Sequence, residues 1–329
     1  MCEFIHQGQK PKNKMASSYN TTFLKGCPNF GGSIYIILHF PSDKYVINQI
    51  IFCIVNCFLI ICTVLLNGAS IFTIVRSSQL RGKVCYFLIL IQSTIDLAVG
   101  AVSLPLYTLA RGGEVLGVAD CALVYFCEKI FGLITGMSFL TLFLLTAERY
   151  LSVMHPVAHR VQLTKRKVLL CSSLTTLPAL LFNFANFPSE IVHSTAIILF
   201  VGTLLALNTF AYVKIFLVAR NLHKSNRIAD FSIAMEQNSS EFERKRKSSQ
   251  EVKLAKSCAL VVVLSYFCYV PGLLCYGFYK NDKLNLRVAY SWSMTIIALN
   301  SSLNSIVFFW KRPLFRGEAV KMLKTMFRV

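Results

Sequence analysis

Seven long apolar stretches constrain the fold of this chain more than any motif does. They lie near residues 46–75, 84–108, 120–147, 168–187, 192–219, 254–279 and 288–310. A helix that crosses a bilayer needs about 20 mostly apolar residues. Helices also satisfy their backbone hydrogen bonds within one segment, whereas a transmembrane β-barrel would show short alternating segments. We therefore predict an all-α membrane protein, a bundle of seven transmembrane helices.

The charged residues support this prediction and indicate an orientation. Only 15% of the residues are charged, against about 25% in soluble domains. The net charge of +19 suggests nucleic acid at first sight. However, the lysines and arginines cluster in alternate loops, which is the pattern of cytoplasmic loops in membrane proteins. We expect a multi-pass plasma-membrane protein with its amino terminus outside, its carboxyl terminus in the cytosol, and no nucleic-acid partner.

The expected organisation has three parts. Residues 1–44 are polar and predict an extracellular tail, mobile and glycosylated at the sequon that begins at Asn20. Residues 45–310 hold the seven helices, and 311–329 form a cytoplasmic end with a short amphipathic eighth helix. Arg111, Lys283 and Arg287 are assigned to outer loops. Most cysteines lie within helices, and the pairing of four stays open: Cys27, Cys121, Cys127 and Cys275.

Two polar residues lie deep inside apolar stretches. Asp96 is the only acid in about 25 apolar residues, and an intramembrane carboxylate is costly enough to be a functional candidate. The alternative is a protonated aspartate with a purely structural role. Asn67 should point inward and form hydrogen bonds to another helix.

The third apolar stretch ends in Glu148-Arg149-Tyr150, followed by Leu-Ser-Val-Met-His-Pro156. This segment resembles the end of the third helix in rhodopsin-type (class A) G-protein-coupled receptors. Further positions resemble that family in the same register, over about residues 45–326. They are Asn67, Asp96, Ser138, Tyr212, Glu251, Pro271, Asn300, Ser301, Asn304 and Phe315. The short loop after the fourth helix, which has no cysteine, is similar to that of the melanocortin, lysophospholipid and cannabinoid branch.

The resemblance implies a receptor that binds an unknown extracellular ligand and activates heterotrimeric G proteins by outward movement of helix 6. It also implies arrestin and a receptor kinase as partners, and no enzymatic activity. In the closed state Arg149 would pair with Glu251. The implied switch residues are Glu148, Arg149, Tyr150, Tyr212, Glu251, Pro271, Asn304 and Phe308. Tyr269, Ser305 and Phe308 depart from the tryptophan, proline and tyrosine that the family usually has.

Two candidate sites follow from the same resemblance. A sodium ion would be held by oxygen atoms, which hard cations prefer, from Asp96, Ser138, Asn300, Ser301 and Asn304; no other cofactor is expected. A ligand would meet side chains that face the outer cavity, namely Glu128, Phe131, Thr135, Tyr269 and Met294. Phe131 stands where amine receptors have an aspartate, which weakens an amine-receptor interpretation. For each aromatic residue or methionine, ordinary helix packing is the alternative.

Other classes of protein remain as alternatives. A transporter or channel would also span the membrane, but the two halves of the chain show no similarity to each other. A membrane enzyme is disfavoured because no clustered His/Asp or Ser/His pattern lies at membrane depth. A receptor-like protein that signals weakly is compatible with the departures at Tyr269, Ser305 and Phe308.

Overall fold

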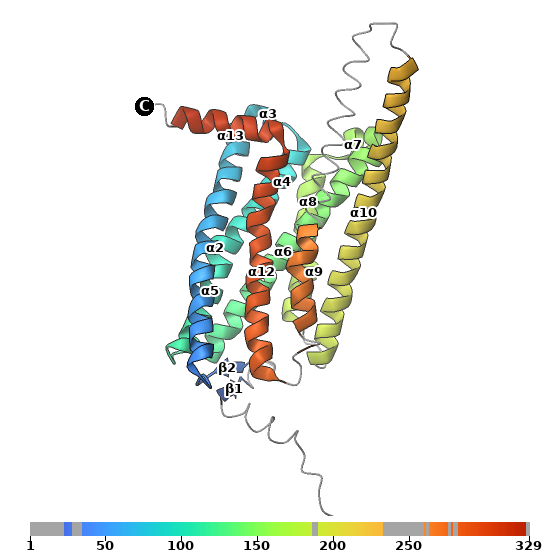
Figure 1. Ribbon diagram of the computed structural model, residues 1–329. Coiled ribbons are helices and arrows are strands. Elements are labelled where there is room, and N and C mark those ends of the chain that lie inside the picture. The colour runs from blue at the N-terminus through green and yellow to red at the C-terminus, as the bar shows by residue number, and fades with distance from the viewer. Residues whose placement is uncertain are drawn as a thin grey trace, which may run out of the picture.

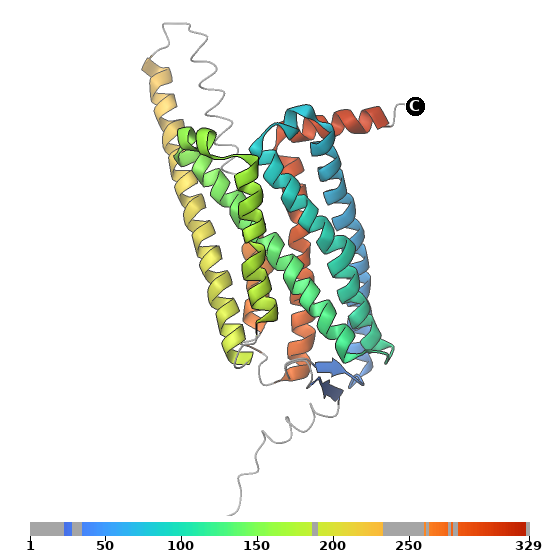
Figure 2. The same ribbon diagram turned by 180° about the vertical axis from the view of Figure 1, so that it is seen from behind.

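The structure is a computed structural model, which describes residues 23–27, 35–185, 190–232, 260, 263–275, 278 and 282–326. The long helices run side by side as a bundle (Figures 1 and 2). Six of the spans are long and apolar enough to cross a membrane, and Val263–Cys275 is a shorter apolar helix. The spans comprise α2 (Asp43–Arg76), α4 (Val84–Ala98) with η2 (Val99–Ser103) and α5 (Leu104–Val115), α6 (Cys121–Met154), α8 (Lys165–Leu174) with α9 (Thr176–Phe184), α10 (Glu190–Ser232) and α12 (Lys283–Lys311). The predicted seven-helix membrane bundle is confirmed.

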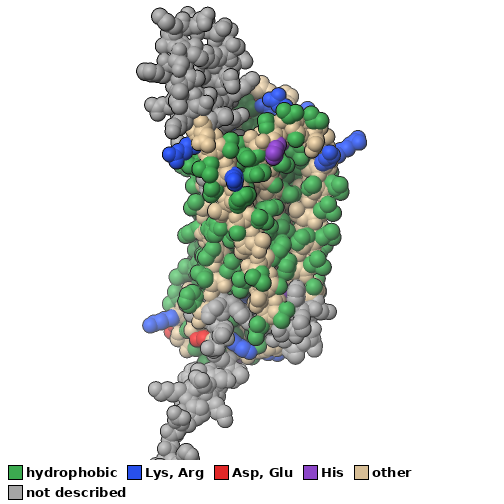
Figure 3. Space-filling model, turned by 90° about the vertical axis from the view of Figure 1, so that its right-hand side faces the viewer, with side chains coloured by type: hydrophobic (Ala, Val, Ile, Leu, Met, Phe, Trp, Pro, Cys, Tyr) green, Lys and Arg blue, Asp and Glu red, His purple; other side chains and the backbone are tan. Residues whose placement is uncertain are grey.

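Short elements mark the two ends of the bundle. At one end, β1 (Leu24–Gly26) pairs with β2 (Tyr35–Ile37) as an antiparallel hairpin. At the other end lie α3 (Ser78–Arg81), α7 (Pro156–Gln162) and α13 (Pro313–Met326), which points sideways from the bundle (Figure 1). We call these the hairpin end and the α13 end. On the face in Figure 3, hydrophobic side chains cover the middle, and lysine and arginine lie toward both ends.

The second span changes its helical form at η2, a π-helical turn. Pro105 follows at the start of α5. Proline has no N–H and crowds the preceding turn, so a wider turn before it accommodates the lost hydrogen bond. At Gly100 an added Cβ would lie 2.8 Å from the Thr63 side chain, so this turn approaches α2 closely.

Caps set the boundaries of two spans at the hairpin end. Asp120 accepts hydrogen bonds from the backbone N–H groups of Ala122 (2.9 Å) and Leu123 (3.2 Å), and α6 begins directly after it. Asp282 accepts one from the backbone N–H of Asn285 (3.1 Å) at the start of α12. Both aspartates satisfy N–H groups that the first turn of a helix leaves unpaired.

Buried polar side chains join α2 to α12. Asn56 donates to Thr295 (3.0 Å), and the hydroxyls of Thr63 and Ser302 lie 2.7 Å apart. Asn67 accepts a hydrogen bond from Ser305 at 2.7 Å, so its predicted inward position is confirmed. Apolar packing gives little preference between helix partners in lipid, whereas such hydrogen bonds fix the register of a helix pair. Ser305, which stands where the resembling family usually has a proline, lies within the continuous helix α12.

Candidate functional site

A cavity of about 500 Å³ lies in the half of the bundle near the hairpin end. Its walls come from β2, α5, α6, α9, α10, α12 and the helical segment 263–275. The five predicted ligand residues all line it, namely Glu128, Phe131, Thr135, Tyr269 and Met294. At its floor the rings of Phe139 and Tyr269 pack with centroids 4.3 Å apart. The structure therefore brings this set together, and a ligand role for it stays a prediction.

Glu128 is tied into a ring of four charged side chains. Its Oε1 lies 2.7 Å from Arg111 Nη2 and 2.7 Å from Arg287 Nη1. Glu114 Oε1 completes the ring, 2.8 Å from Arg287 Nη2 and 3.3 Å from Arg111 Nη1. The side chains of Arg111 and Glu114 are 1% and 0% exposed. Charges buried this deeply require partners, and the two arginines and two carboxylates neutralise each other.

This ring corrects the prediction that Arg111 and Arg287 lie in loops. Arg111 belongs to α5 and Arg287 to α12, and each points a charged group into the bundle. Sequence reasoning also missed Glu114. The available signal was the spacing of Arg111 and Glu114, since residues three apart on a helix lie on the same face.

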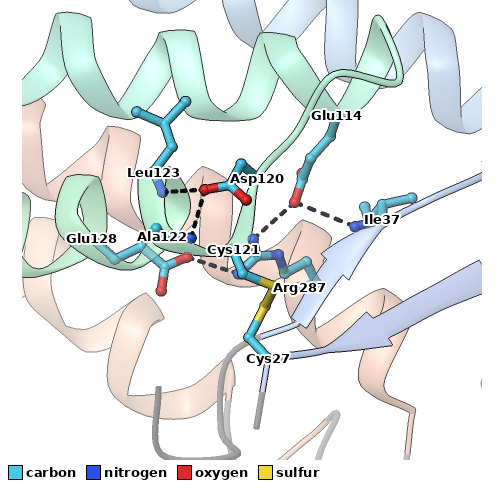
Figure 4. Close-up of a disulfide and its surroundings, with 9 residues drawn as sticks. All are labelled: Cys27, Ile37, Glu114, Asp120, Cys121, Ala122, Leu123, Glu128 and Arg287. Carbon is cyan, nitrogen blue, oxygen red and sulfur yellow. Dashed lines mark hydrogen bonds and ion pairs between the residues drawn. A yellow bond between two sulfur atoms is a disulfide. The ribbon is translucent and has the colours of Figure 1, made fainter. Parts of the chain in front are cut away.

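The hairpin is fixed to the bundle by several contacts. A disulfide joins Cys27 to Cys121, the first residue of α6, and the backbone N–H of Ile37 donates to Glu114 Oε1 at 3.4 Å (Figure 4). Lys283 Nζ donates to the Tyr35 hydroxyl at 2.5 Å. The prediction of a mobile tail over residues 1–44 is thus wrong for the described hairpin. Of the cysteines left open, Cys127 and Cys275 are free thiols. Asn20 lies outside the described residues.

Asp96 is fully buried, and several side chains donate hydrogen bonds to it. Ser138 Oγ donates to Oδ1 at 2.5 Å. Gln92 Nε2 donates to Oδ2 at 2.9 Å, and Asn304 Nδ2 donates to the same oxygen at 3.3 Å. Gln92 Nε2 also donates to Ser138 Oγ at 2.9 Å. Sequence reasoning missed Gln92, although it lies one turn before Asp96 on the same face of α4.

The predicted sodium ligands meet the chemical requirement for a hard cation. Each of these side chains carries an oxygen atom, and those of Asp96 and Ser138 lie 2.5 Å apart. Asn304 turns its amide nitrogen toward Asp96, and Ser301 lies close to the same carboxylate. Asn300 is buried beside Ser301 on α12. The donor set therefore fits sodium, which prefers oxygen. The Gln92 amide competes with sodium binding, because its nitrogen already donates hydrogen bonds to Asp96 and Ser138.

Glu148 holds Arg149 at the α13 end of α6. Glu148 Oε2 lies 2.8 Å from Arg149 Nε, and its other oxygen lies 2.9 Å from His159 Nε2 on α7. The guanidinium of Arg149 also contacts the Cys85 sulfur, which sequence reasoning did not single out. Glu251, the predicted partner of Arg149, lies outside the described residues.

The structure also describes other predicted switch residues. The hydroxyl of Tyr212 on α10 lies 3.0 Å from Thr146 Oγ1, and Tyr150 packs against Tyr212. Phe308 is buried, with the Arg312 guanidinium 5.7 Å from its ring centre. Pro271 lies within the helical segment 263–275.

The predicted eighth helix corresponds to α13, which is attached to the bundle. Phe315 is fully buried and its ring stacks with Tyr86 at 6.3 Å between centroids. Ser77 Oγ donates to Glu318 Oε2 at 2.8 Å, and Lys321 Nζ donates to Glu318 Oε1 at 2.9 Å. The hydrogen bonds from Lys321 and Ser77 lower the pKa of Glu318 below its ordinary value of 4.5.

Comparison with known proteins agrees with this geometry. Residues 66–188 match the family described as 7 transmembrane receptor (rhodopsin family). The matched segment contains Asn67, Asp96, Ser138 and Glu148-Arg149-Tyr150. No curated protein matches the chain in sequence. Fold and match together define a multi-pass membrane protein. Within that class, residues 66–188 are similar to rhodopsin-family receptors.

Proposed function

We propose that this chain is a rhodopsin-type receptor that binds a ligand in the cavity and activates a heterotrimeric G protein at the α13 end. The observation that carries this proposal is the arrangement along α6. Glu128 lines the cavity, Ser138 bonds to Asp96, and Arg149 is held by Glu148 at the far end. Glu128 and Arg149 are about 30 Å apart at about 1.5 Å per residue, close to the thickness of a bilayer core.

The orientation in this proposal places the hairpin end outside the cell and the α13 end in the cytosol. The α13 end carries a high density of basic side chains, from Arg81 through Lys165 to Arg316. Cytoplasmic loops of membrane proteins carry such an excess. The Cys27–Cys121 disulfide at the hairpin end agrees with an oxidising exterior.

Activation in this proposal is a population shift of the bundle. A ligand at the cavity floor contacts Tyr269 and Phe139. It must prefer the conformation in which the sixth span, whose described part is 263–275, moves outward at the α13 end, because a ligand with equal affinity for both states shifts nothing. Pro271 gives that helix a point at which to bend. In the closed state Glu148 would hold Arg149, and His159 would in turn contact Glu148. Outward movement would free Arg149 for a G protein.

A bound sodium ion would supply a positive charge that favours the closed state. Asp96, Ser138, Asn300, Ser301 and Asn304 would hold it. The Arg149–Glu251 pair stays a prediction, as do arrestin and a receptor kinase as partners and the similarity to the melanocortin, lysophospholipid and cannabinoid branch.

The test is nucleotide exchange on a G protein in membranes that contain the full chain, with no ligand added. We expect wild type to exceed empty membranes and Arg149→Ala to lose that activity. Glu148→Gln should raise exchange about tenfold at most, because a charge-assisted contact that holds Arg149 is removed. Arg160→Ala is the matched control, since Arg160 is exposed on neighbouring α7. Activity in wild type that Arg149→Ala leaves unchanged would contradict the proposal.

A further inference from the structure

The cavity has an excess of positive charge. Among its described lining residues, the cations are Lys129, Lys283 and Arg287, and the one carboxylate is that of Glu128. Arg287 and Glu128 belong to the neutral ring with Arg111 and Glu114. The two lysines therefore remain as an excess of two positive charges.

Lys129 lies half-buried in the wall between α6 and α9. Its Nζ donates to the backbone oxygen of Asn183 at 2.5 Å and lies 5.5 Å from the ring centre of Tyr125. Both partners are uncharged, and no carboxylate of the described residues lies within ion-pair distance of this ammonium. An ammonium has three N–H donors. A desolvated charge without a counter-ion is unfavourable, so an anion near Lys129 would stabilise it.

Lys283 lies at the mouth of the cavity beside the hairpin. Its Nζ donates to the Tyr35 hydroxyl and lies 4.2 Å over the Tyr35 ring. Within the described part of the chain, this ammonium also has no carboxylate partner. It remains exposed and can contact a molecule that enters the cavity.

The rest of the cavity is mostly apolar and aromatic toward its floor. That part of the lining includes Phe139, Leu140, Phe200, Val201, Tyr269 and Ile297. Glu128 attracts a cationic ligand only weakly, because its charge is compensated by the two guanidinium groups that donate to Oε1. The cavity thus has a cationic rim, an apolar interior and a neutralised acid.

We propose that this cavity binds a small anionic amphiphile, a molecule with one carboxylate, sulfate or phosphate group and an apolar chain. The anionic group lies at Lys129 and Lys283, and the chain extends toward Phe139 and Tyr269. The volume of about 500 Å³ is in the range of small-molecule sites. The inference deepens the proposed receptor function by naming the ligand class, and binding can be measured without signalling.

The test uses the full chain in phosphatidylcholine nanodiscs with decanoate, decanol and decyltrimethylammonium as matched probes. We expect decanoate to raise the unfolding temperature saturably and to bind at least tenfold more tightly than the other two. Each methylene added from octanoate to dodecanoate should tighten binding about fourfold until the cavity is filled. Equal affinity for all three head groups would overturn the proposal.

Lysine variants locate the anionic group. Lys129→Gln and Lys283→Gln should each weaken decanoate binding about tenfold, the effect of one charged hydrogen bond, and leave decanol binding unchanged. Lys129→Arg keeps the charge and should retain binding. Lys44→Gln is the control, because Lys44 is exposed at the same end and is not among the lining residues. Decanoate affinity within twofold of wild type in both glutamine variants would overturn the assignment.

Two further measurements are needed. The first shows whether the anionic ligand comes from the membrane or from water, and the second distinguishes failure of the ligand class from failure of the receptor function. Phosphatidylglycerol in the nanodisc should compete with decanoate if the natural ligand is a membrane lipid, and should leave its affinity unchanged if the ligand enters from water. Nucleotide exchange is measured in parallel. Saturable decanoate binding without any G-protein activation contradicts the receptor function alone. Basal exchange that depends on Arg149, without decanoate binding, contradicts the ligand class alone.

Discussion

The Gln92 side-chain amide donates to Asp96 Oδ2 at 2.9 Å, one turn further along α4. The same nitrogen donates to Ser138 Oγ at 2.9 Å, so a neutral group bridges two of the oxygens predicted to hold sodium. A carboxylate in an apolar interior needs hydrogen bonds or a counter-ion. Gln92 supplies a hydrogen bond to Asp96 and thereby competes with a sodium counter-ion.

We therefore expect sodium to stabilise Gln92→Leu more than wild type. Leucine removes the bridging amide and leaves Asp96 and Ser138 available to a cation. Sodium affinity should rise about tenfold, equivalent to about 1.4 kcal/mol. The measurement is the unfolding temperature of purified protein in sodium chloride and in choline chloride at equal ionic strength.

Asp96→Asn provides the control for this prediction. It removes the only carboxylate of the set, so the difference between the two salts should disappear in both backgrounds. A wild type that sodium stabilises as strongly as Gln92→Leu would show that the amide does not compete.

The ring of charges predicts a large effect of Arg287→Ala. The substitution leaves Glu114, whose side chain is 0% exposed, with Arg111 at 3.3 Å as its remaining cation. Breaking a buried ion pair from one side destabilises by about 3–5 kcal/mol. Thermal unfolding in detergent measures the loss.

A double variant separates charge from packing in this ring. Glu128→Gln removes a carboxylate that Arg287 contacts at 2.7 Å. Arg287→Ala with Glu128→Gln should therefore lose less stability than the sum of the single variants, as expected for directly coupled residues. Additive losses would mean that the pair contributes only through packing.

The parts of the fold that the sequence predicts are those encoded locally. Apolar length alone predicts the spans, and Asn67 and Asp96 are conspicuous because polar residues in apolar helices are rare. The set of cavity residues followed from the family resemblance, in the register of α6, the segment 263–275 and α12. The position of a residue along the sequence was sufficient to predict its place in the bundle wherever a helix continued without interruption.

The parts that could not be predicted depend on contacts between distant segments. Cys27 and Cys121 pair because the hairpin folds back over α6, which no spacing indicates. Arg111 and Arg287 appeared to be loop charges because each lies near the end of an apolar stretch. Their burial depends on partners from other helices, namely Glu128 of α6 for both arginines and Glu114 of α5 for Arg287.

Gly100 gives a prediction about packing between α2 and η2. An alanine Cβ would lie 2.8 Å from the Thr63 Cβ and Cγ2 atoms, a separation that requires one helix to shift. Overpacking of this kind destabilises by about 1–3 kcal/mol. Gly100→Ala should therefore lower the unfolding temperature measured in detergent.

Gly202→Ala is the matched control for Gly100→Ala. Gly202 lies in α10 with no atom within 4 Å of an added Cβ, so alanine there should be neutral or stabilising by about 0.5–1 kcal/mol. A similar loss in both variants would attribute the effect to the helix backbone and not to contact with Thr63.

Glu318 predicts that acid loosens the attachment of α13. Hydrogen bonds from Lys321 and Ser77 lower its folded-state pKa below 4.5, so the contribution of these bonds is complete above that pH and is lost as pH falls through the lower folded value. A spin label at exposed Arg316→Cys should gain mobility over that acidic range. Glu318→Gln cannot ionise, so in this variant the mobility of the label should no longer depend on pH there. Equal pH dependence in both proteins would assign the effect to another group.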